Sequence, residues 1–462
     1  ICRGTCRWIT SYETRKPGVG VASATPSPTQ IGHFQIKIKS FMVFKTSKFT
    51  SSWRRYIPLT GRRQGMRRVL AMTMMMIMTT AALAGCAGSD VTQDDVDDAY
   101  DEGYAAGAAD NAMVSTLDTI MARGSLNCGV KTSQFGMGYL DADTGTRSGL
   151  DVAYCEALGA ALGVTVTYVD ATQASTRFEK LSSEEIDVLI RTTTWTTSRD
   201  AGLNADFAGI NFYDGQGVLV AQSAFDQAAA GGSVMGLDGV KICVGTGTTT
   251  EGNLLDYFSL NGIAFEAVNV EFEAEAVEKI KSGECEAFTG DMSAVAARKY
   301  LLDQEDNSGN SLSAGTWIAS ETMSKEPLGA ATRDNDDDWN DVVAWVWYAM
   351  VTAEEYGITS ANYESMATAA AADGGNAKHN VLLNTATDLQ LGTPDNMLSD
   401  TWVQDVLAAV GNYGEAYDDA FCDGSYDGTS GSDAMTGCLI DRAGTANALV
   451  SEGGLQYAPP IK

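Results

Sequence analysis

Three groups of polar residues in this sequence have the chemistry to bind a zwitterion. Arg199 carries a planar guanidinium whose paired N–H groups fit a carboxylate. Threonines at 248–250 precede a predicted helix, whose first N–H groups and positive dipole end favour an anion. Asp291 can accept hydrogen bonds from an ammonium group. These residues are donors and an acceptor rather than an acid and a base beside a nucleophile, so they favour binding over catalysis.

Alternating strand and helix patterns must position these groups. From Ser125 the order is β, α, β, α, β, which favours a parallel sheet covered by helices, and a second α/β unit starts at Val240. The first unit has predicted strands at 126–130, 164–169 and 186–190 and helices at 151–162 and 177–181. The second has predicted strands at 240–244, 265–270 and 286–288 and helices at 251–260 and 273–281.

Ligands of open parallel sheets collect beyond the carboxyl ends of the strands. The candidate residues there are Arg191, Thr192, Thr194, Trp195 and Arg199 after residue 190, Thr248 and Thr249 after residue 244, and Asp291 after residue 288. Singly, each has an ordinary structural explanation, because Arg199 can pair with Asp200 and Asp291 can cap a helix. Their joint placement at three strand ends indicates a ligand site.

The segment that begins at Met66 has the layout of an export signal. A basic pair follows Met66, a short apolar run covers 69–84, and small residues precede Cys86. The sequence Leu-Ala-Gly-Cys resembles a lipobox, which implies cleavage before Cys86 and acylation of its thiol. A transmembrane anchor or a core helix is the alternative, but the run is short for a membrane span. We therefore expect a lipoprotein signal peptide at 66–85.

Charge is distributed unevenly along the chain. Residues 1–65 hold 12 Lys and Arg against one acid, whereas the remainder holds 19 against 59 Asp and Glu. This excess of acidic residues repels phosphate backbones, which excludes nucleic-acid binding. Such a composition is typical of proteins kept soluble in salty media. We interpret 1–65 as an unstructured upstream segment, although its basic charge could instead bind an anionic partner. Residues 86–114, rich in Asp, Ala and Gly, are predicted to be an extended acidic tether.

Six cysteines follow Cys86, and an even number outside the cytosol favours disulfide bonds. Many pairings are open, and neighbours in the sequence give Cys128 with Cys155, Cys243 with Cys285, and Cys422 with Cys438. No two of these cysteines have C-x-x-C spacing, and this part of the chain has one histidine, His379, which we interpret as a solvated loop residue. We therefore expect no metal site.

Several longer stretches resemble the general L-amino-acid-binding proteins of polar amino acid ABC importers. In chain order they are Glu185–Asp200, Phe212–Gly217, Gly247–Glu251, Ser324–Gly329, Ala353–Thr359, Gly411–Glu415 and Gly453–Pro460. The resemblance extends from about Leu117 to the C-terminus. It implies an α/β, two-lobed periplasmic binding protein fold, in which each lobe is a mostly parallel sheet flanked by helices and a two-strand hinge joins the lobes.

The same resemblance places the domain boundaries. The two strands that cross between the lobes fall near 213–221 and 325–332. Lobe 1 then covers 115–215 plus 325–462, and lobe 2 covers 216–324.

Roles for individual residues also follow from the resemblance. Arg199 would bind the ligand carboxylate together with Thr194 and Thr249, and Asp291 would hold the α-ammonium with Thr192 nearby. Trp195 is a candidate wall of the site or, equally, a core or hinge residue.

Three features depart from the family pattern. The acidic tether is an addition, and the Cys422 to Cys438 segment resembles an inserted disulfide loop. The loop at 132–139, which would face the ligand side chain, is weakly matched, so the side-chain preference stays open. Arg191 stands where smaller members of the superfamily commonly have a small polar residue, so its role as a ligand-binding residue is left open.

The function that the resemblance implies is a lipid-anchored extracytoplasmic solute-binding protein. It would be a monomer without cofactor, would capture L-amino acids between the lobes, and would deliver them to the permease and ATPase subunits of an ABC importer. The ligand would bridge the lobes and shift the population toward the closed form. Two alternatives remain open: a dehydratase-like enzyme, which needs an acid or base aimed at the substrate, and a sensory receptor with a signalling partner.

Overall fold

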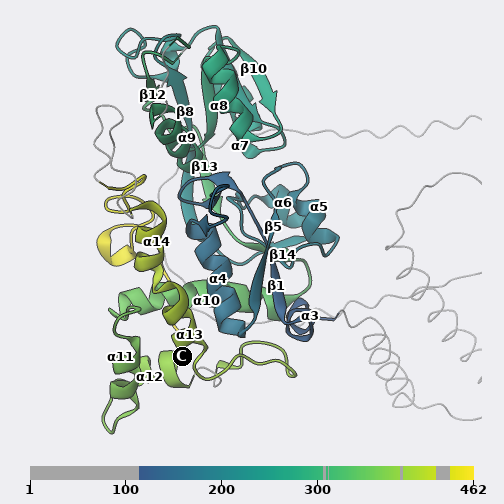
Figure 1. Ribbon diagram of the computed structural model, residues 1–462, viewed down its shortest axis with the longest axis vertical. Helices are drawn as coiled ribbons and strands as arrows, with labels where there is room; N and C mark the ends of the chain where they lie inside the picture. Colours follow the sequence, from purple (N-terminus) through teal and green to yellow (C-terminus); the bar gives the residue numbers. More distant parts are fainter. Residues whose placement is uncertain (1–113, 305–308, 311, 386–388, 423–436) are drawn as a thin grey trace, which may run out of the picture. The chain divides into compact units, whose positions relative to one another are not determined.

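The computed structural model describes residues 114–304, 309–310, 312–385, 389–422 and 437–462 (Figure 1). The expected signal peptide at 66–85 lies outside these residues. So does the expected tether at 86–114, which begins with Cys86, except for its last residue, Val114. Two β-sheets, each with its own helices, organise the described chain, and a small three-stranded sheet accompanies them.

The first sheet has the strand order β5-β1-β6-β14-β7. Strand β1 is parallel to β5 and β6, whereas β14 is antiparallel to both of its neighbours. The strands are β1 (Ser125–Val130), β5 (Thr165–Asp170), β6 (Val188–Leu189), β7 (Ala205–Phe207) and β14 (Ala331–Arg333). The connecting helices are α4 (Leu150–Leu162), α5 (Arg177–Ser182) and α6 (Thr197–Gly202), and α3 (Thr116–Arg123) precedes β1.

The second sheet has the strand order β10-β9-β11-β8-β12. Strands β9, β10 and β11 are parallel, and β8 runs antiparallel to β11 and β12. The strands are β8 (Phe212–Ala221), β9 (Val240–Gly245), β10 (Phe265–Val270), β11 (Ala287–Asp291) and β12 (Thr316–Ile318). Its helices are α7 (Thr249–Leu260), α8 (Glu273–Ser282) and α9 (Met292–Gln304), and a short 3-10 turn, η1 (Val234–Gly236), precedes β9.

Two strands connect the sheets. The first half of β8 pairs with β13 (Lys325–Leu328) in antiparallel register, from Phe212 opposite Leu328 to Gly215 opposite Lys325. The second half of β8 then belongs to the second sheet, and β14 follows β13 into the first sheet. This is the two-strand connection expected near 213–221 and 325–332.

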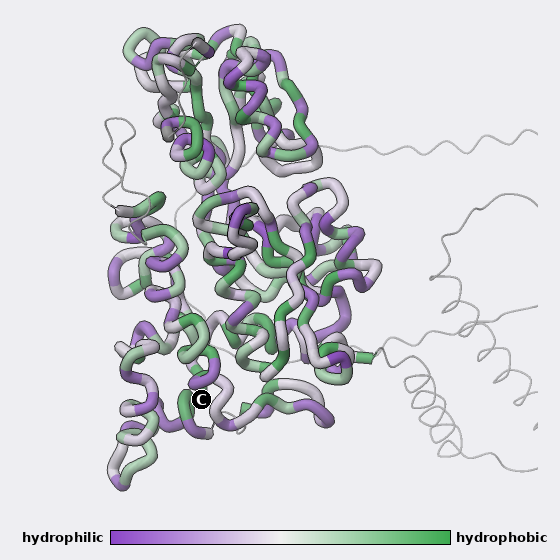
Figure 2. The backbone as a smooth tube through the Cα atoms, viewed as in Figure 1, coloured by the Kyte–Doolittle hydropathy of each residue, from purple (hydrophilic) through white to green (hydrophobic). Residues whose placement is uncertain are grey.

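Both sheets have two hydrophobic clusters, and the smaller cluster of the first sheet lies around Leu189 and Phe207. The second sheet has a separate hydrophobic cluster on each face, one around Phe258 and one around Phe288. The first sheet shares one large cluster with the C-terminal helices, which includes the buried indoles of Trp339, Trp347 and Trp402. Those helices are α10 (Asp337–Glu355), α11 (Tyr363–Ala371), α12 (Ala377–Asn384), α13 (Trp402–Val410) and α14 (Tyr413–Phe421), with the 3-10 turn η3 (Val450–Glu452) after them. Figure 2 shows hydrophilic and hydrophobic residues interleaved along these helices.

The sequence predicts most elements closely but misplaces two strand ends. The strand expected at 186–190 pairs only over Val188–Leu189. The strand expected at 286–288 continues to Asp291, because the long strand β8 pairs with β11 as far as Gln216 opposite Asp291. Asp291 is therefore the last residue of a strand rather than part of the loop that follows it.

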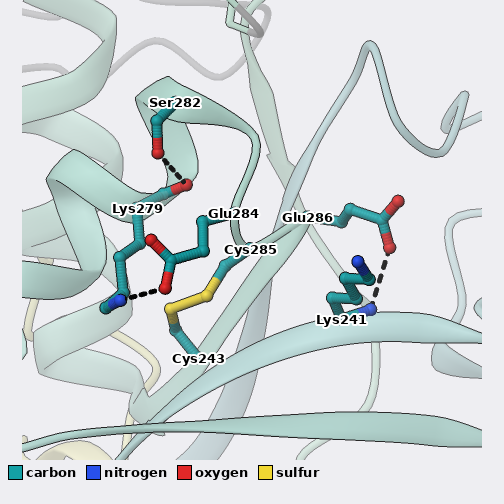
Figure 3. The surroundings of a disulfide bond; sticks show 7 residues. All are labelled: Lys241, Cys243, Lys279, Ser282, Glu284, Cys285 and Glu286. Atoms are coloured by element: carbon teal, nitrogen blue, oxygen red, sulfur yellow. Dashed lines mark hydrogen bonds and ion pairs between the residues drawn. A yellow bond between two sulfur atoms is a disulfide. The ribbon is translucent and has the colours of Figure 1, made fainter.

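Three disulfide bonds join cysteines that neighbour one another in the sequence. Cys128 on β1 binds Cys155 on α4, Cys422 binds Cys438, and Cys243 on β9 binds Cys285 (Figure 3). Beside the third bond, Lys279 forms an ion pair with Glu284 (Figure 3). Within the described ranges, no three His, Cys, Asp or Glu residues gather as metal ligands, and no helix is long and apolar enough to cross a membrane.

Candidate ligand-binding site

A polar cavity lies where strand ends of the two sheets meet. It contains about 280 Å³ of space, part of it open to solvent. We name each side of the cavity for the sheet to which its residues connect. The first-sheet side consists of Lys131, Arg177, Arg191, Thr192, Thr194 and Arg199. The second-sheet side consists of Thr248, Thr249, Thr250, Glu273 and Asp291. Seven of the eight residues predicted to bind ligand are therefore brought together here, and only Trp195 is not.

Arg199 is held in place by its own short helix. Thr196 caps α6, and its hydroxyl accepts a hydrogen bond from the Arg199 backbone N–H at 3.3 Å. The side chain is buried, and its Nη1 donates to the carbonyl of Thr194 at 2.8 Å. Because a guanidinium has five N–H groups, this bond fixes its orientation and leaves donors for a ligand carboxylate. Burial lowers the pKa of Arg199, and opposing Asp291 partly offsets the shift.

The start of α7 supplies donors from the opposite side of the cavity. Thr248 is the N-cap, and its hydroxyl accepts from the Glu251 backbone N–H at 3.1 Å. The Thr249 hydroxyl lies 3.3 Å from that of Thr194 and donates to Glu326 Oε2 at 2.7 Å. The pair Thr194 and Thr249 therefore links the two sides, beside the free N–H groups of the first helical turn.

Asp291 faces these donors from the end of β11. Burial raises the pKa of its carboxyl well above the ordinary value, and the neighbouring acids Asp214 and Glu326 raise the pKa further. A cation at this position would favour the ionised carboxylate instead. The side chain is thus suited to bind an ammonium group.

Thr192 occupies a strained backbone position beside the cavity. Its φ is 46°, a left-handed conformation that is unusual for a β-branched residue. The backbone N–H donates to Asp151 Oδ2 at 3.2 Å, and burial raises the pKa of Asp151 to about 6. The Thr192 hydroxyl is buried and has no hydrogen-bond partner among the described residues. Asp151 thereby holds Thr192 in a conformation in which it lines the cavity.

Three residues of the cavity were missed by the sequence reasoning: Lys131, Arg177 and Glu273. Lys131 directly follows β1 and Glu273 opens the helix after β10, so the strand-end rule would have found both had it been applied to every strand. Lys131 Nζ donates to Gln134 Oε1 at 2.6 Å and to Glu273 Oε2 at 3.0 Å, across the cavity.

The ion pair of Lys131 and Glu273 changes the pKa of both groups. Burial lowers the pKa of Lys131 to about 8, an effect that Glu273 partly offsets. Burial alone would raise the pKa of Glu273, but Lys131, Arg298 and Arg191 together lower it to about 2. Glu273 is therefore ionised throughout the neutral range and acts as a fixed negative charge.

Trp195 does not line the cavity, although it was a candidate wall of the site. The Trp195 ring stacks on Phe207 with centroids 5.6 Å apart, and its indole N–H donates to Asp200 at 2.9 Å. Its backbone N–H donates to Pro327 of the connecting strand β13, which favours the hinge interpretation over the ligand wall.

The loop at 132–139 contains β2 (Ser133–Gln134) and most of β3 (Gly138–Leu140), which pairs with β4 (Arg147–Ser148). None of its residues lines the cavity. Instead, Gln134 Nε2 donates to Ser293 Oγ at 3.0 Å, and Arg298 Nη1 donates to the Ser133 carbonyl at 3.0 Å. The loop therefore joins the first-sheet part of the chain to helix α9 of the second.

Comparison with known proteins decides the family. The family model described as bacterial extracellular solute-binding proteins, family 3, matches residues 126–363. The chain belongs to this family. The glutamate/glutamine/aspartate/asparagine-binding protein BztA of Rhodobacter capsulatus is 40% identical over 363 residues, which is 78% of this chain and 96% of the relative. The general L-amino acid-binding periplasmic protein AapJ of Rhizobium johnstonii is 37% identical, over 77% of this chain and 95% of the relative.

A solved structure supports the same assignment. An ABC transporter periplasmic binding protein from Brucella ovis, solved with glutathione bound, is 37% identical and has a TM-score of 0.64. It covers 76% of this chain and the whole of its own. The two-lobed periplasmic binding protein fold and the resemblance to amino-acid-binding proteins of ABC importers are thus confirmed. As a member of this family, the protein is an extracytoplasmic solute-binding protein.

Proposed function

We propose that this protein captures an L-amino acid in the cavity between its two sheets and delivers it to an ABC permease. The observation that carries the proposal is the arrangement of donors and acceptor around one cavity. Arg199 and the start of α7 offer N–H groups and a positive field to a carboxylate, and Asp291 offers an acceptor to an ammonium group.

Ligand capture would stabilise a closed arrangement of the lobes. A bound amino acid would contact both sides, with its carboxylate near Arg199 and Thr249 and its ammonium near Asp291 and Thr192. Because these contacts exist together only when the lobes are close, the ligand binds the closed form better and shifts the population toward it. The closed form is then what the permease recognises.

The remaining parts of the proposal rest on the sequence. Acylation of Cys86 would anchor the protein to the membrane surface, and residues 86–114 would tether the lobes to that anchor. Lobe 1 would cover 115–215 plus 325–462, and lobe 2 would cover 216–324. The protein would act as a monomer with the permease and ATPase subunits as partners, and without catalysis. The relatives are named as binding proteins, so neither a dehydratase-like enzyme nor a sensory receptor is favoured.

A thermal-shift screen tests the proposal. The purified protein, freed of ligand by unfolding and refolding, is melted with each of the twenty L-amino acids. A ligand at about 100 times its Kd stabilises the folded state by about 2.7 kcal/mol, which raises the melting temperature by several degrees.

Several amino acids should stabilise the wild-type protein, and Arg199→Ala or Asp291→Ala should strongly reduce the shift. Arg147→Ala serves as the matched control, because Arg147 lies over the ring of Tyr168, outside the cavity, and should leave the shift intact. No shift with any amino acid would contradict the proposed function.

A further inference from the structure

Three arginines line the cavity, and the proposed function uses only one of them. Arg199 is assigned to the ligand carboxylate, whereas Arg177 and Arg191 have no assigned partner. Their side chains are nearly inaccessible, with residue exposures of 2% for Arg177 and 4% for Arg191. Two buried cations beside a ligand site call for an explanation.

The hydrogen bonding of both guanidiniums is incomplete. Nε and Nη1 of Arg177 are buried without a hydrogen-bond partner in the described parts of the chain, and its guanidinium lies over the ring of Phe178 at 5.2 Å. Arg191 Nη2 donates to the carbonyl of Thr172 at 2.5 Å, but its Nε also lacks a partner there. Unsatisfied buried donors are costly, so they mark positions that an acceptor can fill.

No carboxylate of the described chain forms an ion pair with either arginine. Of the two acids that line the cavity, Glu273 binds Lys131 at 3.0 Å, and Asp291 is assigned to the ligand ammonium. Buried Asp151 is nearby, but it accepts the Thr192 backbone N–H. A simple zwitterion would therefore leave both guanidiniums of Arg177 and Arg191 without a counter-charge in contact.

The three arginines also repel one another. Burial lowers the pKa of Arg177 well below its ordinary value, and the positive charges of Arg191 and Arg199 lower it further. An anion placed between them would reduce this repulsion and supply acceptors for the unsatisfied N–H groups. Because Arg199 is assigned to the α-carboxylate, an anion beside Arg177 and Arg191 would come from a second group of the ligand.

We propose that Arg177 and Arg191 form a subsite for a second carboxylate carried by the ligand side chain, which makes dicarboxylic L-amino acids the preferred ligands. This inference rests on the proposed function. It predicts that L-glutamate binds more tightly than L-glutamine, and L-aspartate more tightly than L-asparagine, although each amide has nearly the same shape as its acid.

Calorimetric titration of the ligand-free full chain measures the ratio of Kd values within each pair. In the wild-type protein the acid should bind on the order of tenfold or more tightly than the amide, because charge-assisted bidentate hydrogen bonds are stronger than neutral ones. In Arg177→Gln and Arg191→Gln this preference should fall toward unity. Arg147→Gln, which removes one positive charge outside the cavity, should keep the wild-type preference.

The ratio compares two ligands on one variant, so partial misfolding of that variant cannot imitate a loss of preference. Equal affinity for glutamate and glutamine in the wild-type protein, or a preference that survives in both variants, would overturn the subsite and leave the proposed function standing. Failure of all four ligands to bind would overturn the proposed function itself, and the subsite with it.

Discussion

The two sides of the cavity differ in charge, although both are built from residues at strand ends and helix starts. The first-sheet side holds all four cations of the cavity, Lys131, Arg177, Arg191 and Arg199, and no acid. The second-sheet side holds three threonines and the two acids Glu273 and Asp291, and no cation. This separation of charge favours one orientation of an amino acid, with carboxylate toward the arginines and ammonium toward Asp291.

The two sides also differ in how completely their polar groups are paired. On the second-sheet side, the Thr249 hydroxyl donates to Glu326, and the Thr250 carbonyl accepts from Gln216 Nε2 at 2.9 Å. On the first-sheet side, buried N–H groups of Arg177 and Arg191 lack partners in the described chain. The threonines are thus already held in place by the protein, whereas the arginines still have capacity for a ligand.

The largest expected effect on binding comes from removing the carboxylate partner on the cationic side. Arg199→Ala should weaken binding of any L-amino acid by about 2 kcal/mol or more, because one partner of a buried charge pair is lost. Calorimetric titration would measure the change in Kd. An affinity within a few-fold of the wild-type value would show that the carboxylate lies elsewhere.

The next effect concerns the acid on the opposite side and depends on pH. Because the pKa of Asp291 is raised in the free site and an ammonium group favours the ionised form, binding must release a proton whenever Asp291 starts protonated. Affinity should therefore weaken as pH falls through that raised pKa, by up to about tenfold per pH unit. Titrations between pH 5 and pH 8 would measure this slope.

Asp291→Asn removes the titrating carboxyl group. It should therefore flatten the dependence of affinity on pH and weaken binding at neutral pH. Burial raises the pKa of neighbouring Asp214 and of Asp151 to about 6 and lowers that of Lys131 to about 8, so any slope left in the variant is assigned to these three groups. The other charged neighbours, Glu273 and Glu326, are the same in both proteins. A slope unchanged by the substitution would remove Asp291 from the ammonium site.

A smaller effect is expected where the two sides touch. Thr249→Ala removes the hydroxyl that lies near Thr194 and donates to Glu326, and should weaken binding by about 1 kcal/mol. Thr249→Ser keeps the hydroxyl and should bind nearly as the wild-type protein does. Equal losses in both variants would attribute the effect to the methyl group rather than to the hydrogen bonds.

The smallest effect on binding should come from the disulfide bond of the second sheet. Replacing Cys243 and Cys285 together by serine removes a cross-link between residues 42 apart in the sequence and should lower stability by about 2 to 4 kcal/mol. Neither cysteine lines the cavity, so Kd should stay unchanged at temperatures where the variant is folded. Denaturant unfolding and calorimetry would separate the two quantities.

Much of this arrangement could be predicted from the sequence, because strand and helix patterns are local. The strand at 265–270 matches β10 residue for residue, and the helix expected from Glu251 starts at Thr249. The end of β11 was misplaced because its length depends on pairing with β8, more than 60 residues earlier in the chain. Strand ends are thus the least local feature, since a distant partner sets them.

Part of the candidate site could also be predicted, because strand ends can be located approximately from local sequence patterns. Residues after three strands were identified as a group, and the structure brings Arg199, Thr249 and Asp291 to one cavity. Arg177 was missed because it opens a short helix that looks ordinary in the sequence, and its incomplete hydrogen bonding exists only in three dimensions. The sequence left Trp195 open between a wall of the site and a core or hinge role, and its ring stacks on Phe207.

A crystal structure of the protein with a bound L-amino acid would show directly how the ligand is held. We expect a ligand between the two sheets, with its α-carboxylate hydrogen-bonded to Arg199 and the N–H groups at the start of α7, and its ammonium bound to Asp291. A ligand bound in this cavity in the reverse orientation, or bound at another place on the protein, would contradict this expectation.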